Sequence, residues 1–204
     1  MEKPASTDYP IADLLRRRWS PRAFSERAVE EEKLLYLFEA ARWAPSCFND
    51  QPWRFIVARR EDGGAYERLL LCLVDGNRIW AQRAPVLVLS VAKLAFDHNG
   101  KPNRHAFHDV GMAALSLALQ ATEMGLRIHQ MAGFDEQAAR AAFAVPDGFE
   151  PAAAIAIGYP GAPESLPEEL RSKEGSSRTR KRLSELVFGH NWGSAASWLG
   201  SSDQ

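Results

Sequence analysis

The stretch Val86-Leu87-Val88-Leu89-Ser90-Val91-Ala92, which follows Pro85, decides the fold class of this chain. It is continuously apolar apart from one serine, and it is rich in β-branched valine. Such a run is typical of a strand at the centre of a sheet, because both of its faces must be covered by other apolar elements. The sequence therefore predicts a sheet with helices on both sides.

Further strands and helices are predicted on either side of this run. Aromatic and β-branched residues predict a strand over Trp53–Arg59, and short extended pieces are expected over Ile128–Met131 and Ala152–Ile157. The chain after Gly161 is expected to be loop-like. This alternation, without an internal repeat, predicts one layered α/β or α+β domain. Helical spacing predicts helices at Ile11–Leu15, Glu30–Trp43, Ala65–Val74, Asn77–Ala84, Ala106–Met124 and Asp135–Phe143.

The predicted helix Ala106–Met124 is apolar on almost every side and ends at Gly125, a residue typical of helix C-termini. A helix without a polar face is expected to be buried. Two interpretations remain open. The helix is either the core of one subunit, or part of it is covered by a second copy of the chain.

Composition narrows the function classes. The chain has 204 residues, of which 46% are hydrophobic and 25% charged, with a net charge of −1. These values indicate one globular domain and exclude a disordered chain. No apolar stretch reaches the ~20 residues of a membrane helix, and the N-terminus has no signal-peptide core, so neither export nor membrane insertion is expected. A near-neutral chain also argues against nucleic-acid binding.

Most sequence motifs for catalysis are absent. The chain has no GxGxxG after a strand, no GxxxxGK[ST] and no GxSxG. His105 and His108, beside Asp109, lack a third ligand at a recognised spacing, so no metal site is expected. Cys47 and Cys72 form no CxxC pair, which suits a reducing compartment such as the cytoplasm. Cys47 is interpreted as a packing residue rather than a nucleophile.

Two groups of residues could bind a ligand. Arginines cluster at Arg16–Arg18 with Arg22, and again over 178–182, and they are either two solvated faces or two halves of one anion site. The amides of Asn49 and Gln51 lie in a loop that leads into a strand. Their donors and acceptors fit the polar edge of a flavin ring, although a turn of ordinary composition explains them equally well.

Six motifs together resemble the nitroreductase family of FMN-dependent oxidoreductases. They follow the family's order and spacing and extend from about Ile11 to Val187. The second of them is the most specific. The motifs are RWSPRAF at 18–24, APSCFNDQPWRF at 44–55, GNRIWAQRAPVLV at 76–88, ATEMGL at 121–126, QMAGFD at 130–135 and RTRKRLSELV at 178–187.

The resemblance implies an α+β fold with three layers, in which a mixed β-sheet is flanked by helices. It further implies an intertwined homodimer built around a long central helix, with one tightly bound FMN at each of two sites between the subunits. Residues 1–204 would then form a single nitroreductase-like domain, with residues 1–10 and 188–204 as peripheral tails.

The resemblance also implies roles for individual residues. Arg18, Trp19, Ser20 and Arg22 would hold the FMN, with Arg18 at the phosphate and Arg22 near the N1/O2 edge of the flavin. Pro45, Ser46, Cys47 and Asn49 would reach the cofactor from the partner subunit. Asn77 would meet the pyrimidine edge, Met131, Ala132 and Gly133 would pass close to the ring, and Arg178 and Arg180 would close on the phosphate.

The activity implied is hydride transfer from NAD(P)H, bound transiently, through FMN to a small acceptor such as a nitroaromatic or a quinone, with ping-pong kinetics. A fixed cation such as Arg22 would stabilise the anionic reduced flavin. No side chain stands out as a proton donor. Trp80 and Ala132 stand where some family members carry a Lys and a Glu, and the segment Phe96–His105 is expected to set acceptor choice. The alternative is a flavin-binding sensor or storage protein without turnover.

Overall fold

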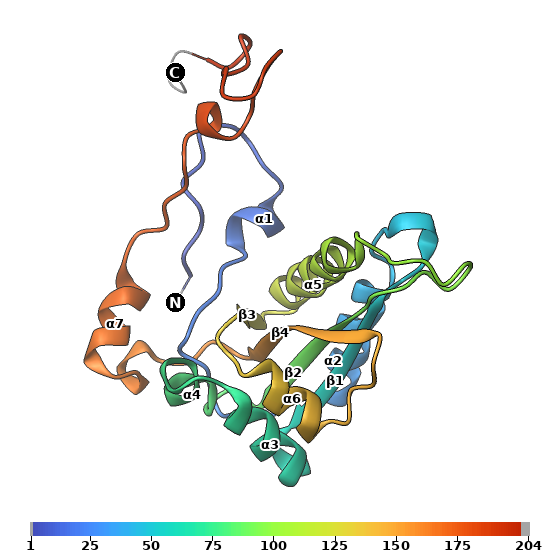
Figure 1. Cartoon of the computed structure of the whole chain (residues 1–204). Coiled ribbons are helices and arrows are strands. Elements are labelled where there is room, and N and C mark those ends of the chain that lie inside the picture. Colours follow the sequence, from blue (N-terminus) through green and yellow to red (C-terminus); the bar gives the residue numbers. More distant parts are fainter. Residues whose placement is uncertain (1, 201–204) are drawn as a thin grey trace.

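The computed structural model describes residues 2–200, in which a four-stranded sheet lies between two layers of helices (Figure 1). Met1 and residues 201–204, which belong to the two expected tails, lie outside the described residues. The strands stand in the order β1-β2-β4-β3. Their bounds are Trp53–Arg59 for β1, Val86–Lys93 for β2, Arg127–Met131 for β3 and Phe149–Gly158 for β4.

Strand β2 is central, as predicted. It pairs with β1 on one side, where Val57 lies opposite Val88, and with β4 on the other, where Ile155 lies opposite Val88. Every residue of Val86–Ala92 is buried. The apolar run therefore serves both faces of the sheet.

The expectation of a mixed sheet was wrong for the described strands, because all three pairings are antiparallel. Helix α5 (Ala106–Glu123) connects β2 to β3, and these two strands run parallel to each other, as a helical crossover favours. Strand β4 lies between them and runs antiparallel to both. The parallel relation is therefore present in the sheet but involves no neighbouring strands.

Helices cover both faces of the sheet, which confirms the three-layer α+β fold. On one face, Leu37 of α2 (Glu31–Arg42) and Leu117 of α5 belong to the same buried cluster as Val88. On the other face, Leu69 and Trp80 share a buried cluster with Leu87 of β2. This second layer consists of α3 (Gly64–Cys72), α4 (Asp75–Ala81) and α6 (Glu136–Ala142).

Helix α5 has the predicted start and ends one residue earlier than predicted, before Gly125 in the left-handed conformation at φ +75°. It is not buried on all sides within one chain. Val110, Ala113 and Leu117 face the core, whereas Phe107 and Leu115 are 45% and 44% exposed. Burial of the whole helix therefore stays a prediction that depends on a second copy of the chain.

The two ends of the described chain run together outside the sheet (Figure 1). The Arg178 guanidinium donates to the carbonyl oxygens of Lys3 at 2.8 Å and of Arg16 at 3.0 Å. The expectation of a loop-like chain after Gly161 was wrong, because 168–175 forms a helix. The remaining elements are α1 (Asp13–Arg17), α7 (Glu168–Gly175), and single turns at Cys47–Asn49, Arg60–Asp62, Pro163–Ser165 and Leu183–Glu185. No helix of residues 2–200 has the length and apolarity needed to cross a bilayer.

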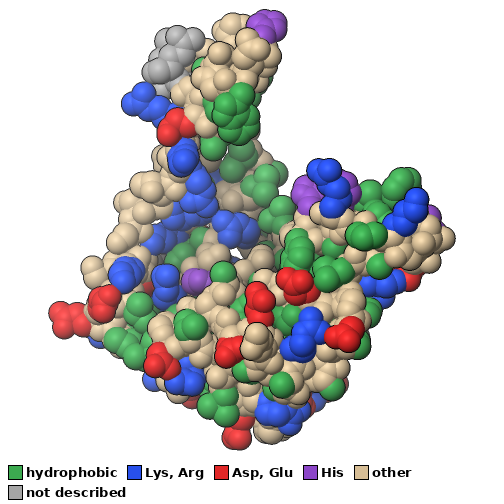
Figure 2. Space-filling view, in the orientation of Figure 1, with side chains coloured by type: hydrophobic (Ala, Val, Ile, Leu, Met, Phe, Trp, Pro, Cys, Tyr) green, Lys and Arg blue, Asp and Glu red, His purple; other side chains and the backbone are tan. Residues whose placement is uncertain are grey.

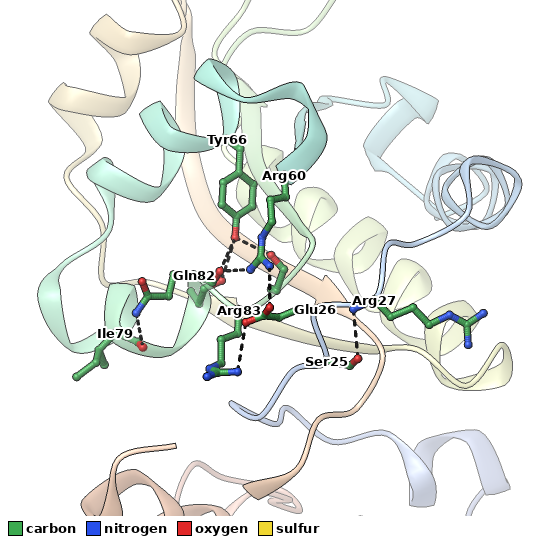
Figure 3. Close-up of polar contacts among 10 residues, drawn as sticks. Ser25, Glu26, Arg27, Arg60, Tyr66, Ile79, Gln82 and Arg83 are labelled. Atoms are coloured by element: carbon green, nitrogen blue, oxygen red, sulfur yellow. Dashed lines mark hydrogen bonds and ion pairs between the residues drawn. The ribbon is translucent and has the colours of Figure 1, made fainter. Parts of the chain in front are cut away.

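The loop after Trp19 is fixed where it returns to the sheet. Phe24 forms a β-bridge with Pro160, next to the end of β4. Just beyond it, the Glu26 carboxylate lies 3.3 Å from the Arg83 guanidinium and 3.8 Å from that of Arg60 (Figure 3). These contacts attach the loop to the ends of β1 and α4, so Arg22 stands on a loop with a fixed end.

Candidate cofactor-binding site

The two arginine clusters line one cavity of about 240 Å³. The first cluster contributes Arg18 and Arg22, and the second contributes Arg178 and Arg180. Figure 2 shows Lys and Arg side chains gathered in the hollow between the body of the molecule and its projecting terminal segments. Of the two interpretations left open by the sequence, the geometry supports two halves of one anion site. Trp19, Ser20, Lys3, Lys173, Glu174, Ser176 and Ser177 complete the lining.

Electrostatics in this cavity are unfavourable in the absence of an anion. Burial lowers the pKa of the Arg18 guanidinium, and the nearby Arg180 lowers it further. Burial, Arg18 and Arg180 likewise lower the pKa of Arg178. The hydrogen-bond partners of these three side chains among residues 2–200 are neutral oxygens, such as Ser20 Oγ for Arg18. A cluster of cations that repel one another fits a phosphate group, which would supply the missing negative charge.

The peptide group between Pro21 and Arg22 is held at its carbonyl by the half-buried His129 and at its N–H by the buried Glu174. His129 of β3 lies 2.8 Å, through Nδ1, from the carbonyl oxygen of Pro21, so Nδ1 is the protonated nitrogen. Burial lowers the pKa of His129 to about 4, and the charge of Arg22 contributes in the same direction, so the ring is neutral at pH 7. The second side chain is Glu174 of α7, whose carboxylate accepts from the Arg22 N–H at 2.9 Å.

Trp80, which stands where some family members carry a Lys, lies in the core of this protein. It is 1% exposed, and its ring lies 4.6 Å from the His129 ring and 6.2 Å from the Phe24 ring. Trp80 therefore belongs to the packing behind the Arg22 loop. The Trp80 ring contributes to the burial of the His129 ring, and burial is the main cause of the low pKa of His129.

The chain after β3 passes close to α4. Asn77 Nδ2 donates to the Gly133 carbonyl at 3.0 Å, and a Cβ added at Gly133 would lie 2.7 Å from that nitrogen. Only glycine fits there without displacing Asn77. Asn77 and Arg22 line a second cavity of about 530 Å³, between α4 and α7. Arg22 thus belongs to both cavities, whereas Met131 is a core residue and Ala132 is exposed.

The Pro45–Asn49 segment lies apart from these two cavities. Pro45 and Asn49 line a separate cavity beside Trp43, and Asn49 lines another beside His98. The structure therefore does not bring this segment to the arginine cavity within one chain. Its expected route to the cofactor, through a partner subunit, stays a prediction.

This segment has an unusual backbone. Phe48, Asn49 and Gln51 have φ values of +52°, +54° and +49°, in the left-handed region that most side chains avoid. The buried Asp109 of α5 holds the segment by accepting from the Cys47 N–H at 3.0 Å. Phe48 is 78% exposed. A strained turn that presents an exposed aromatic ring is typical of a binding surface.

Three of the residues that shape the site were missed from the sequence. Glu174 lies in a polar stretch without a motif, His129 precedes the QMAGFD motif without being part of it, and Asp109 stands out only as the neighbour of His108. Each is identified by what its buried side chain contacts. No local sequence signal reports such a contact, because the partners are backbone groups far away in the chain.

Residues 15–159 match the family model of the nitroreductase family. A 15.4 kDa protein of Mycolicibacterium smegmatis is 35% identical over 149 residues, which are 69% of this chain and 97% of that protein. A Streptomyces coelicolor protein with the provisional name NADH dehydrogenase/NAD(P)H nitroreductase is 30% identical over 167 residues, which are 71% of this chain and 80% of its own.

Solved structures share the fold. A crystal structure described as an oxidoreductase containing FMN superposes with a TM-score of 0.85 at 34% identity, and the match covers 92% of this chain and 95% of the other. A nitroreductase family protein from Clostridium difficile has a TM-score of 0.68 at 29% identity, with 87% and 96% of the two chains covered. The arrangement of sheet and helices is therefore one found in experimental structures.

Proposed function

The chain belongs to the nitroreductase family, and from this we propose that it is an FMN-dependent oxidoreductase that passes a hydride from NAD(P)H to a small acceptor. One observation carries the proposal. Arginines about 160 positions apart in the sequence line one cavity, and among residues 2–200 none of their guanidinium groups there is paired with a carboxylate. The FMN named for a solved relative would supply the phosphate that this cavity fits.

In this proposal Arg18, Arg178 and Arg180 bind the FMN phosphate, beside Trp19 and Ser20, because they line the cavity from both ends of the chain. Arg22 lines both cavities and would face the polar N1/O2 edge of the ring. FMN held by these residues would supply the capacity to take up a hydride and to release two electrons. The contribution of Arg22 is a fixed positive charge that favours the reduced, anionic form.

Asn77 and the backbone of Met131, Ala132 and Gly133 would form the wall against the ring. The hydrogen bond from Asn77 to the Gly133 carbonyl holds this wall in place, and the missing Cβ of Gly133 leaves the space that close approach needs. The residues of this site bind and orient; none of them is assigned as a proton donor.

We also propose that the enzyme is a homodimer. Pro45, Ser46, Cys47 and Asn49 would then complete the site of the partner subunit, since they lie apart from the arginine cavity of their own chain. Apolar residues exposed on separate elements support this, among them Phe107 and Leu115 of α5, Phe48 and Trp192. Light scattering of the purified protein would give the mass of two chains of 22.7 kDa; a monomer with full FMN binding would refute the shared site.

NAD(P)H and the acceptor would use the same position over the flavin in turn, which gives ping-pong kinetics. Nitroaromatics and quinones are the acceptors proposed. Phe48 and Phe96, whose rings lie 5.7 Å apart, would select flat acceptors, with the 96–105 segment held by a 2.8 Å hydrogen bond from the Asp97 N–H to the Asp50 carboxylate. The cytoplasm, which supplies NAD(P)H, is the proposed location.

Anaerobic reduction tests the proposal. The purified protein is expected to carry FMN, to lose its flavin absorption on addition of NADH or NADPH, and to recover it with menadione or nitrofurazone. Flavin that binds but is reduced by neither nucleotide would favour a flavin sensor or store. Protein that neither contains nor takes up FMN would refute both readings.

A further inference from the structure

Glu174 is the residue of α7 that the fold buries, and it is a charged one. The helix carries one apolar residue, Leu170, which is partly buried against the core, whereas Glu174 is its buried residue, at 2% exposure. Carboxylates are rarely buried without a specific partner, since removal from water is costly. The burial of this side chain therefore calls for an explanation from its contacts.

The contacts of the Glu174 carboxylate are backbone N–H groups. Oε1 accepts from the Arg22 N–H at 2.9 Å and from the Ala23 N–H at 3.1 Å, and Oε2 accepts from the Arg22 N–H at 3.1 Å. No ion pair of Glu174 is formed among residues 2–200, although it lines the arginine cavity beside six cationic side chains. The carboxylate thus binds the loop rather than neutralising the cluster.

Glu174 lies close to one arginine cluster in the sequence and contacts the other through its side chain. It precedes Arg178 by four residues, and its carboxylate binds the backbone of Arg22, which follows Arg18 by four residues. Beside the bonds from Arg178 to the Lys3 and Arg16 carbonyls, this side chain therefore forms a second connection between the two halves of the cavity, and it is the one that reaches Arg22. The Lys3 ammonium, which donates to the Glu174 backbone carbonyl, attaches the N-terminal segment to the same point.

We propose that Glu174 is a positioning residue that fixes the Arg18–Arg22 loop against the Arg178–Arg180 segment, so that both halves meet the same phosphate. The inference rests on the proposed FMN function. If Glu174 served only for packing, an apolar side chain of the same size would suffice. If it served only to neutralise the arginines, its carboxylate would lie against a guanidinium. Neither describes a carboxylate bound to two consecutive backbone N–H groups.

Two substitutions with side chains of similar volume distinguish the hydrogen-bond acceptance of Glu174 from its charge and its size. Glu174→Gln keeps Oε1, which by itself accepts from both N–H groups, and loses the charge. Glu174→Leu fills the space and accepts no hydrogen bond. Glu168→Leu, on the exposed first turn of the same helix, is the matched control. Apo-protein of each variant is titrated with FMN and with riboflavin, which lacks the phosphate, by flavin fluorescence.

The ratio of riboflavin Kd to FMN Kd measures the contribution of the phosphate to affinity, which depends on both halves of the cavity. Glu174→Leu is expected to lower this ratio by about tenfold or more, because two backbone N–H groups lose their acceptor. Glu174→Gln and Glu168→Leu are expected to keep it within about threefold. An unchanged ratio in Glu174→Leu would refute the proposal, and so would an equal loss in Glu174→Gln.

A second measurement covers the case in which Glu174→Leu does not fold. Hydrogen exchange of the Arg22 and Ala23 amides is followed in wild type and in Glu174→Gln, with far-UV circular dichroism as the check of folding. Protected amides together with a retained ratio support the proposal, whereas freely exchanging amides with a retained ratio refute it. Wild-type protein that fails to bind FMN would instead refute the proposed function.

Discussion

Acidification is expected to destabilise the protein through His129, and the size of the effect follows from its environment. Burial holds the pKa of His129 at about 4 in the folded chain, below the ordinary value of 6.5 that applies when the chain is unfolded. The unfolded state therefore binds a proton at a higher pH than the folded state. The contribution to stability is complete above pH 6.5 and is lost as the pH falls toward 4.

The magnitude is set by the difference between the two pKa values. Over the interval from about pH 7.5 to about pH 5, the shift corresponds to a loss of about 2 kcal/mol in the free energy of unfolding. His129→Asn removes the titrating ring and keeps an N–H donor for the Pro21 carbonyl, so the variant should lack this loss.

Urea unfolding of apo-protein at the two pH values checks this, with Gln130→Asn, at the exposed next position of β3, as the control. The wild type and the control are expected to lose about 2 kcal/mol more than His129→Asn. Equal pH dependence in all three proteins would refute the reasoning, since it would mean that the buried ring does not stay neutral.

Three other substitutions test the neighbouring contacts. Gly133→Ala is expected to raise the FMN Kd by about tenfold, because a Cβ there would lie 2.7 Å from a side-chain nitrogen; fluorescence titration measures it, and unchanged affinity would count against the close approach. Asp109→Ala should lower the free energy of unfolding by about 1–3 kcal/mol in urea, since the Cys47 N–H loses a carboxylate acceptor. Ser90→Ala should also lower the free energy of unfolding by about 1–3 kcal/mol in the same assay. The buried Ser90 hydroxyl donates to the Ala153 carbonyl and accepts from the Ala153 N–H, where the pairing of β2 with β4 is irregular. A neutral effect would show that water or a rearranged strand replaces these bonds.

The apolar elements of the fold could be predicted from the sequence, because periodicity and apolar content report burial directly. Strand Trp53–Arg59 has the predicted bounds, and Asp135 caps α6 by accepting from the Ala138 N–H at 2.9 Å, as its position suggested. Helix α7 escaped prediction because no apolar stripe marks it. The antiparallel sheet escaped prediction because it results from β4 lying between β2 and β3, and local sequence patterns do not encode the position of a strand in the sheet.

At the candidate site, the arginines that line the cavity could be predicted from the sequence, but the residues that hold their backbone in place could not. Arg18 and Arg178 were recognisable as halves of one anion site through family motifs, and the structure brings them to one cavity. Glu174 and His129 act on backbone atoms more than a hundred positions away. Any acceptor or donor of suitable length could serve there, so the residue type carries no signature, and only the three-dimensional contact identifies it.

The contacts between residues 3–23 and residues 174–178 have a consequence for biosynthesis. The anion cavity cannot exist on a nascent chain until residue 180 has left the ribosome, because half of its cations and its connecting carboxylate lie at 173–180, more than 150 positions after Arg18 and Arg22. Until then Arg18 and Arg22 stand on a partly folded domain, without the opposing segment. Closure of so long a loop comes late in folding. We therefore expect cofactor binding to require α7 and the segment after it, so that ribosome-stalled chains that end before α7 are unable to retain FMN.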